Sequence, residues 1–183
     1  EGDYLLTIGR LEPRKNLVRL LHAYDGLPED LRARTSLLFA GPEGWRNEDM
    51  HSYLAERHSA GTVKLLGFVA EETQADLYAA AAAFVYPSLA EGFGLPVLEA
   101  LACGAAVATS GSTALPEVAG DAALYFDPTD TDDMRSVLER LLTDEAEAER
   151  LRTKALERAT RFTWKKAASE TLELYERLGG GTP

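Results

Sequence analysis

Two glutamates that bracket a glycine-rich turn are the residues of this sequence best suited to chemistry. Glu91 precedes the turn, Gly92 and Gly94 lie within it, and Glu99 follows it. An apolar run ends just before the turn and a helical pattern begins after it, so the turn joins a strand to a helix. Backbone N–H groups at such a helix start are unpaired, and the helix dipole presents its positive end there. The segment therefore predicts a site for a ligand that carries both phosphate and hydroxyl groups.

The residues of the turn suit this ligand chemistry. Gly92 and Gly94 permit the backbone to approach a phosphate closely, and Pro96 suits the first helical position because it has no N–H to leave unpaired. Glu99, in the first turn of the helix, is placed to accept hydrogen bonds from ribose hydroxyls. The run 92–97 resembles the start of a dinucleotide fingerprint, but it follows the fourth strand instead of the first and ends in a valine. A nicotinamide cofactor is rejected on these grounds.

A second group of chemically useful residues is the cationic loop after the first strand. Arg10, Arg14 and Lys15 lie in this loop. A guanidinium can grip a diphosphate with its planar fork, and an ammonium adds a point charge. Taken alone, the loop is equally compatible with incidental solvated charges. Its place at the carboxyl edge of a parallel sheet favours phosphate binding.

Weaker signals lie in other loops. The backbone of 67–69, after the third strand, is suited to the edge of a base, and Ser112 and Thr113 follow the fifth strand. Trp45 is more typical of a partly buried loop anchor than of a stacking platform. Cys103 lies among small residues and is predicted to be a buried structural thiol.

The composition limits the classes of function. The chain has 183 residues, 45% of them hydrophobic, which is enough for one domain with a substantial core. The 30 acidic residues against 19 basic ones give a formal charge of -11, which argues against a general nucleic-acid binder. The single cysteine excludes an internal disulfide, and no histidine pair has the spacing of metal ligands, so no metal site is predicted.

The ends and the hydropathy of the chain bear on its location. No apolar run approaches the length of a membrane span and no signal peptide is visible, so we expect a cytoplasmic protein. The chain begins at Glu1 without a methionine and opens almost directly into a strand, so we expect a fragment of a longer protein. Whether that protein binds peripherally to the inner face of a membrane is left open by the sequence.

Strand-like and helix-like segments alternate as far as residue 128 and are followed by helices only. Apolar runs predict six strands, at 4–8, 36–40, 63–66, 83–86, 106–109 and 123–126. Helical patterns occur at 17–24, 48–59, 71–81, 98–104, 131–143, 145–161 and 163–178, with Asn16, Thr131 and Asp144 as N-caps. We therefore expect an α/β fold with a doubly wound six-stranded parallel sheet over residues 1–128. The C-terminal helices of residues 129–183 are expected to pack on the same domain.

Taken in order, these motifs resemble those of glycosyltransferase family four, retaining nucleotide-sugar transferases of the GT-B fold. The resembling segments are 9–11 with 15–17, the turn 66–69, 87–88 with 91–96, 99–100 and 116–118. The likeness runs from about residue 4 to residue 128, and the helical tail fits as well. The two glutamates with seven residues between them make it specific. The chain is similar to the C-terminal, Rossmann-like half of such an enzyme.

The resemblance implies a role for each matching side chain. Arg10 and Lys15 match the cationic pair that holds the donor diphosphate, and Glu99 matches the carboxylate that binds the ribose hydroxyls. Glu91 matches an acid near the donor hexose. Arg10, Lys15 and Glu91 are therefore the candidate catalytic residues.

Backbone contacts are implied in the same way. Phe93, Gly94 and Leu95 match the turn that contacts the hexose and the phosphate, and Val69 matches the position whose backbone recognises the base. Together with Arg10, Lys15 and Glu99, these are the candidate donor-binding residues. The family needs no bound metal for phosphate binding, so no cofactor is expected besides the donor substrate.

The implied function is transfer of a hexose, with mannose as the first choice, from a GDP- or UDP-linked donor to a sugar, lipid or small-molecule acceptor. In the family an N-terminal domain supplies the acceptor site, so this chain alone is expected to be inactive. Two alternatives remain open. One is a GT-B-like epimerase, and the other is a non-catalytic nucleotide-binding or interaction domain.

Overall fold

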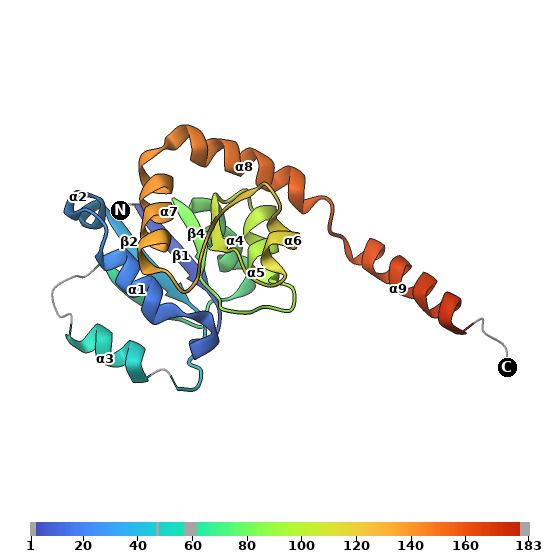
Figure 1. Ribbon diagram of the computed structural model, residues 1–183, viewed down its shortest axis with the longest axis horizontal. Helices are drawn as coiled ribbons and strands as arrows, with labels where there is room; N and C mark the ends of the chain where they lie inside the picture. Colours follow the sequence, from blue (N-terminus) through green and yellow to red (C-terminus); the bar gives the residue numbers. More distant parts are fainter. Residues whose placement is uncertain (1–2, 47, 57–61, 180–183) are drawn as a thin grey trace.

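The computed structural model, which describes residues 3–46, 48–56 and 62–179, is built on a six-stranded sheet (Figure 1). The strands are β1 Asp3–Ile8, β2 Thr35–Ala40, β3 Val63–Gly67, β4 Ala83–Tyr86, β5 Val107–Ser110 and β6 Ala123–Phe126. They lie in the order β3-β2-β1-β4-β5-β6, and every neighbouring pair is parallel. The predicted doubly wound α/β sheet is confirmed. The chain reverses its direction of travel across the sheet between β1 and β4, which opens a crevice beyond the carboxyl ends of these strands.

Helices connect the strands and continue after β6. The connecting elements are a 3₁₀ turn, η1 Pro13–Lys15, and the helices α1 Leu17–Asp25, α2 Glu29–Arg34, α3 Glu48–Glu56, α4 Glu71–Ala80, α5 Leu95–Ala102 and α6 Leu115–Ala119. After β6 come α7 Thr131–Thr143, α8 Glu145–Ala159 and α9 Trp164–Gly179. The last three residues of the helix predicted at 48–59 lie outside the described residues.

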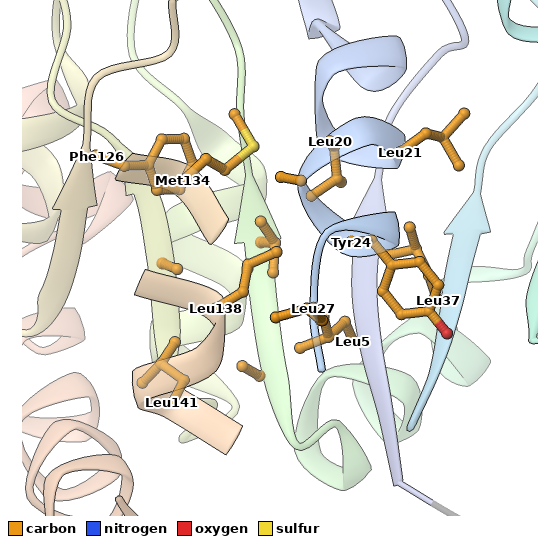
Figure 2. Packing of buried hydrophobic residues seen from close by; sticks show 14 of the residues in the cluster. Leu5, Leu20, Leu21, Tyr24, Leu27, Leu37, Phe126, Met134, Leu138 and Leu141 are labelled. Atoms are coloured by element: carbon orange, nitrogen blue, oxygen red, sulfur yellow. The ribbon is translucent and has the colours of Figure 1, made fainter. Parts of the chain in front are cut away.

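The two faces of the sheet are covered by different helices, because successive residues of a strand point to opposite faces. Leu5 of β1 belongs to the core cluster under α1 and α7, whereas Leu6 belongs to the cluster under α4, α5 and α6. Figure 2 shows the first cluster, in which Tyr24 of α1 and Met134 of α7 lie on the same side of the sheet. Each such buried side chain contributes about 1.5–3 kcal/mol. The two layers hold the strands rigidly, and hence the loops at their carboxyl ends.

The C-terminal helices do not all pack on the sheet domain. α7 packs against α1 and α8 packs against α5, whereas α9 projects away from the body of the molecule (Figure 1). None of the residues 164–179, all of which the structure describes, is buried; Trp164 is 85% exposed and Leu178 is 73% exposed. The expectation that residues 129–183 pack together on this domain is therefore wrong for α9. Its apolar face has no covering surface among the described residues.

The third strand also differs from the sequence prediction. Its apolar run suggested a strand buried on both faces, but β3 lies at the edge of the sheet. Leu65 and Leu66 are consequently 40% and 38% exposed. A short apolar run has the same pattern in a central strand and in an edge strand, so only the strand order distinguishes them.

Asn16 precedes α1 as predicted, but its side chain does not cap the helix. The backbone at Asn16 is left-handed, with a φ of 58°, and no side-chain cap is formed there. Instead Nδ2 donates to the carbonyl oxygens of Pro87 at 3.1 Å and of Pro128 at 2.7 Å. Asn16 therefore joins the start of α1 to the end of β4 and to the connection between β6 and α7.

The caps of the later helices are local, as a sequence pattern can predict. Asp130 caps α7, one residue before the predicted Thr131, and its Oδ1 accepts hydrogen bonds from two amides of the first turn at 2.9 and 3.0 Å. Asp144 caps α8 as predicted, accepting from Glu147 N at 3.0 Å. Aspartate and threonine are both good N-caps, so propensity alone did not choose between neighbours.

Replacing Asn16 tests whether its hydrogen bonds to Pro87 O and Pro128 O stabilise the fold. Asn16→Ala leaves the buried carbonyl of Pro87 without this donor, so we expect the free energy of unfolding to fall by about 1–3 kcal/mol. Urea denaturation measures the change. Asn16→Gly is the matched control, because glycine adopts a positive φ without steric cost but loses the same hydrogen bonds. A glycine variant as stable as the wild type would mean that these hydrogen bonds contribute nothing.

Candidate active site

Two adjoining cavities lie beyond the carboxyl ends of the central strands. The larger, of about 250 Å³, is lined by residues from the loops after β1, β2 and β3, including Arg10 and Val69, and by Gln74 of α4. The smaller, of about 10 Å³, has room for roughly one water molecule and is lined by Arg10, Lys15 and Tyr86. Arg10 lines both cavities, so the cationic loop and the predicted base-binding turn border adjoining cavities.

Gly94 fixes the start of α5 at this edge. It is the N-cap with a φ of 100°, and a Cβ there would lie 2.5 Å from Leu115 Cδ2, so only glycine fits. No side chain of the described residues caps α5. Pro96 has no N–H and Val97 N donates to Gly94 O at 3.0 Å, so α5 offers an anion the amide of Leu95 and the positive end of the helix dipole. The helix begins at Leu95, three residues earlier than predicted. Glu99 therefore lies in the second turn and not in the first.

Glu91 is held by four donors that converge on one oxygen. Its Oε1 accepts from Lys15 Nζ at 2.7 Å, Ser88 Oγ at 2.7 Å and Tyr86 OH at 2.9 Å, and Arg14 Nη1 lies 2.6 Å away. Burial alone raises the pKa of Glu91, but the hydrogen bonds from Lys15, Ser88 and Arg14 outweigh it and lower the pKa to about 2. Glu91 is therefore a carboxylate throughout the physiological pH range. It is suited to stabilising positive charge and not to donating a proton.

Lys15 is a buried cation, 8% exposed, on the cavity side of Glu91. Its ammonium donates to Tyr86 OH at 2.5 Å and to Glu91 at 2.7 Å. An ammonium has three donors, so one remains for a ligand in the cavity. Arg10 is exposed, and its Nη1 makes a long, weak hydrogen bond of 3.4 Å to Glu43 O. The guanidinium can therefore turn toward a ligand at little cost in free energy.

Glu99 is exposed on α5 and is oriented by a buried tyrosine. Tyr78 OH, from α4, donates to Glu99 Oε2 at 3.1 Å. Burial raises the pKa of Tyr78, and the charge of Glu99 raises it further, so the hydroxyl remains a donor. The Tyr78 ring packs edge-on against Phe84 with centroids 5.0 Å apart, and Phe84 stacks on Tyr86 at 5.9 Å. Each of the two glutamates thus has a tyrosine partner, and the two tyrosines both contact Phe84.

The serine and threonine after β5 support the loop that carries Glu91. Thr113 Oγ1 accepts from Glu91 N at 3.0 Å, and Ser112 Oγ donates to Leu89 O at 3.1 Å. These two residues therefore hold the Glu91 loop through hydrogen bonds to its backbone. On the far side of the turn, the Phe93 ring packs against Phe162, with centroids 5.9 Å apart.

The structure brings most of the predicted site residues together. Arg10 shares one cavity with Lys15 and the other with Val69, and Lys15 contacts Glu91 directly. Glu99 lines neither of these two cavities and is linked to the group through its tyrosine partner. Phe93 and Leu95, at 41% and 49% exposed, leave their backbone turn accessible.

Two predictions about other residues change. Trp45, predicted to be a partly buried loop anchor, is 56% exposed, and the Arg46 guanidinium lies 5.6 Å from its ring centroid. Cys103 is only partly buried, against the second core cluster, and burial raises the pKa of its thiol. A raised thiol pKa agrees with a structural role for this cysteine.

Sequence reasoning missed Tyr78 and Tyr86 as parts of the site; it noted Arg14 as a loop cation and Ser88 as part of a motif, but gave neither of them a role at Glu91. Tyr86 and Ser88 stand at the end of the fourth strand, which is a recognisable position for site residues. Nothing local in the sequence pairs Arg14 with Glu91 or Tyr78 with Glu99, because those partners lie far away along the chain and meet only in the folded sheet.

The described part of the chain has neither a cluster of metal-ligating side chains nor a helix suited to cross a membrane. It contains no group of three or more His, Cys, Asp or Glu side chains arranged to hold a metal ion. Over the same residues, no helix is both long and apolar enough to traverse a bilayer.

Comparison with known proteins identifies relatives over nearly the whole chain. The family model described as "Glycosyl transferases group 1" matches residues 1–158. The O-antigen chain mannosyltransferase B of Escherichia coli is 41% identical over 175 residues, covering 96% of this chain and 46% of that protein. A serotype-specific mannosyltransferase WbdA of Escherichia coli is 39% identical over 178 residues, covering 96% of this chain and 22% of that protein. The chain thus spans less than half the length of these relatives.

Solved structures of other proteins share the fold of this chain. Sucrose-phosphate synthase from Thermosynechococcus elongatus superposes with a TM-score of 0.85 at 27% identity, covering 100% of this chain and 47% of that chain. WaaG, a glycosyltransferase involved in lipopolysaccharide biosynthesis, superposes with a TM-score of 0.77 at 26% identity, covering 91% of this chain and 46% of that chain.

The contacts of Glu91 predict a pH dependence of stability. Its pKa is about 2 in the folded chain against an ordinary value of 4.5, so the stability that its contacts contribute is fully present above about pH 4.5 and is lost as the pH falls toward 2. This lowering of the pKa corresponds to about 3 kcal/mol of stability. We therefore expect the stability gap between wild type and Glu91→Gln, measured by urea denaturation, to shrink across this window.

The same substitution on the exposed helix α9, Glu173→Gln, is the control and should change little at any pH. A gap between wild type and Glu91→Gln that stays constant from about pH 5 to about pH 3 would show that the Glu91 contacts do not lower its pKa.

Proposed function

Because this chain belongs to the glycosyl transferases group 1 family, we propose that it is the donor-binding half of a retaining hexosyltransferase. Arg10 and Lys15 bind the diphosphate of a nucleotide sugar, with the Leu95 amide at the start of α5 as a further donor. Glu99 binds the ribose hydroxyls, and the base enters the larger cavity beside Val69. The observation that carries the proposal is the cleft in which Arg10 and Lys15 meet at the sheet's switch point, with Glu91 against Lys15.

We propose mannose as the sugar and GDP as its carrier. The support is the identity of 41% and 39% to proteins named as mannosyltransferases. These names also favour sugar transfer over epimerisation, and over a non-catalytic domain. A cavity of about 250 Å³ at the base position is large enough for a purine.

The chemistry follows from the charges at the site. Departure of the diphosphate puts negative charge on the leaving group, which Arg10 and Lys15 stabilise, so no metal is needed for this step. Positive charge develops on the hexose at the same time, as in other reactions at a glycosidic carbon. An ionised Glu91 beside the sugar stabilises that charge electrostatically. It has no proton to give the leaving group, so its proposed role is not that of a general acid.

The acceptor site belongs, on this proposal, to the part of the parent enzyme that this chain does not span. The isolated chain then binds nucleotide weakly and transfers no sugar. In the parent enzyme the acceptor is a sugar, a lipid or a small molecule, and the reaction takes place in the cytoplasm, with peripheral association at the inner face of the membrane if the acceptor is a lipid.

Calorimetric titration of the chain with GDP, UDP and guanosine tests the proposal. We expect GDP to bind more tightly than UDP, and Arg10→Ala to weaken GDP binding by about tenfold to a hundredfold through loss of a charge-assisted contact. Guanosine affinity should not change in this variant. Arg177→Ala, on the exposed helix α9, is the matched control. Absence of heat with millimolar GDP, or equal losses for GDP and guanosine, would overturn the diphosphate assignment.

Tyr78→Phe tests the ribose assignment without touching the ligand. The variant keeps the ring but removes the hydroxyl that orients Glu99, so we expect GDP affinity to fall by about twofold to tenfold, less than for Glu99→Ala. A 2′,3′-dideoxy analogue of GDP lacks the hydroxyls that Glu99 binds. It should bind the wild type and both variants equally; a loss that is the same for GDP and the analogue would argue against ribose recognition by Glu99.

A further inference from the structure

Arg14 binds the loop that carries Glu91 through both its backbone and its side chain. Its carbonyl oxygen accepts from Leu89 N at 2.9 Å and lies 3.1 Å from Ser88 Oγ. Its Nη1 donates to Ala90 O at 2.8 Å and lies 2.6 Å from Glu91 Oε1. One residue of η1 thus contacts four consecutive residues after β4. Such a dense set of contacts fixes the position of the loop before any ligand arrives.

The two cations on Glu91 approach it from different sides. Lys15 lines the smaller cavity together with Arg10, whereas Arg14 is not among the residues that line either of the two cavities. The side-chain partners of Arg14 are Glu12, at 2.8 Å, and the Ala90–Glu91 segment. Lys15 can therefore contact both Glu91 and a ligand in the cavity, whereas Arg14 contacts only groups of the protein itself.

A bound diphosphate changes the charge balance around Glu91. It brings at least two negative charges to Lys15, whose single positive charge is then divided between the ligand and Glu91. A carboxylate that faces a nearby anion without a cation of its own tends to take up a proton. The groups that face Glu91 are Arg14 and Lys15 from η1, Tyr86 from β4 and Ser88 from the following loop, and Glu12 faces Arg14. Arg14 is the cation in this set that a ligand in the cavity does not draw on.

We propose that Arg14 is a positioning residue: it is the counter-ion that keeps Glu91 ionised and in place when the donor diphosphate engages Lys15. The proposal rests on the proposed function, since it concerns the same donor site. It assigns different tasks to two adjacent cations of one 3₁₀ turn. Lys15 stabilises the leaving group, and Arg14 preserves the negative charge of Glu91 next to the sugar.

An NMR titration of the whole chain, labelled with ¹³C at the glutamate carboxyl carbons, tests the proposal. The Glu91 signal is assigned by its loss in Glu91→Gln, and its midpoint is measured in the free chain and with saturating GDP or inorganic pyrophosphate. In the wild type we expect a low midpoint in all three states. In Arg14→Gln we expect a rise of about one pH unit in the free chain and a further rise of about one pH unit with either ligand.

Two variants separate the charge of Arg14 from its packing. Arg14→Gln keeps a donor for Ala90 O but has no charge, whereas Arg14→Lys keeps the charge without the guanidinium fork. The Arg14 side chain is 42% exposed, so neither change opens a hole in the core. We expect Arg14→Lys to keep the low Glu91 midpoint with and without ligand. A merely structural role for Arg14 would disturb both variants alike.

Calorimetry in buffers of different ionisation enthalpy gives a second readout. At about pH 3.5, between the two midpoints expected for Arg14→Gln, pyrophosphate binding should take up more protons in this variant than in the wild type. An unchanged Glu91 midpoint in folded Arg14→Gln would overturn the proposal. If neither GDP nor pyrophosphate binds to the wild type, the proposed function fails, and with it the ligand-dependent role of Arg14. The midpoint in the free chain still decides whether Arg14 is the counter-ion of Glu91.

Discussion

The buried ion pair between Lys15 and Glu91 is the contact on which the arrangement of the site depends. A charged side chain that is only 8% exposed is stable only if its lost hydration is replaced. Here Glu91 and the Tyr86 hydroxyl replace it. The pair joins the loop after β1 to the loop after β4, across the point where the sheet changes direction. Two segments about 75 residues apart are thereby held at one edge before a ligand is present.

The surrounding contacts make this pair rigid. Asn16 ties the start of α1 to the end of β4, and Thr113 supports Glu91 from the loop after β5. On the other side, Phe84 packs between Tyr78 and Tyr86, so the tyrosine that orients Glu99 and the one that contacts Glu91 lie against one core side chain. A ligand that enters such a site does not have to order the loops, which is the advantage of preorganised polar groups in catalysis.

The close packing around the site does not extend over the whole chain. The sheet and the helices through α8 form two continuous hydrophobic layers, but α9 contributes no buried residue. None of the contacts described above for Glu91 and Glu99 involves α9. The polar network described above is accordingly complete within this chain, although the chain spans less than half of the relatives it matches.

The sequence predicted where the candidate site lies better than it predicted which side chains contact one another there. The carboxyl edge of the sheet follows from the order of strands and helices, and Arg10, Lys15, Glu91 and Glu99 all stand in or next to loops at that edge. Their partners were not predictable: Tyr78 has no sequence feature that distinguishes it from an ordinary core residue, and the cationic loop marks Arg14 without pairing it with Glu91. Asn16 shows the same limit, because its side chain is equally suited to a helix cap and to a bond with a distant carbonyl.

By itself the sequence determined the number and type of the strands, the parallel sheet and the glycine-rich turn, because these depend on periodicity and backbone geometry within a few residues. Tertiary structure alone decided that β3 is an edge, that Glu99 lies in the second turn of α5, and that α9 leaves the domain. It also decided that, of the two neighbouring cations on Glu91, Lys15 lines a cavity and Arg14 does not line either of the two. The physical reason is that burial and charge pairing depend on which surfaces meet, and residues far apart in a chain meet only when the sheet has formed.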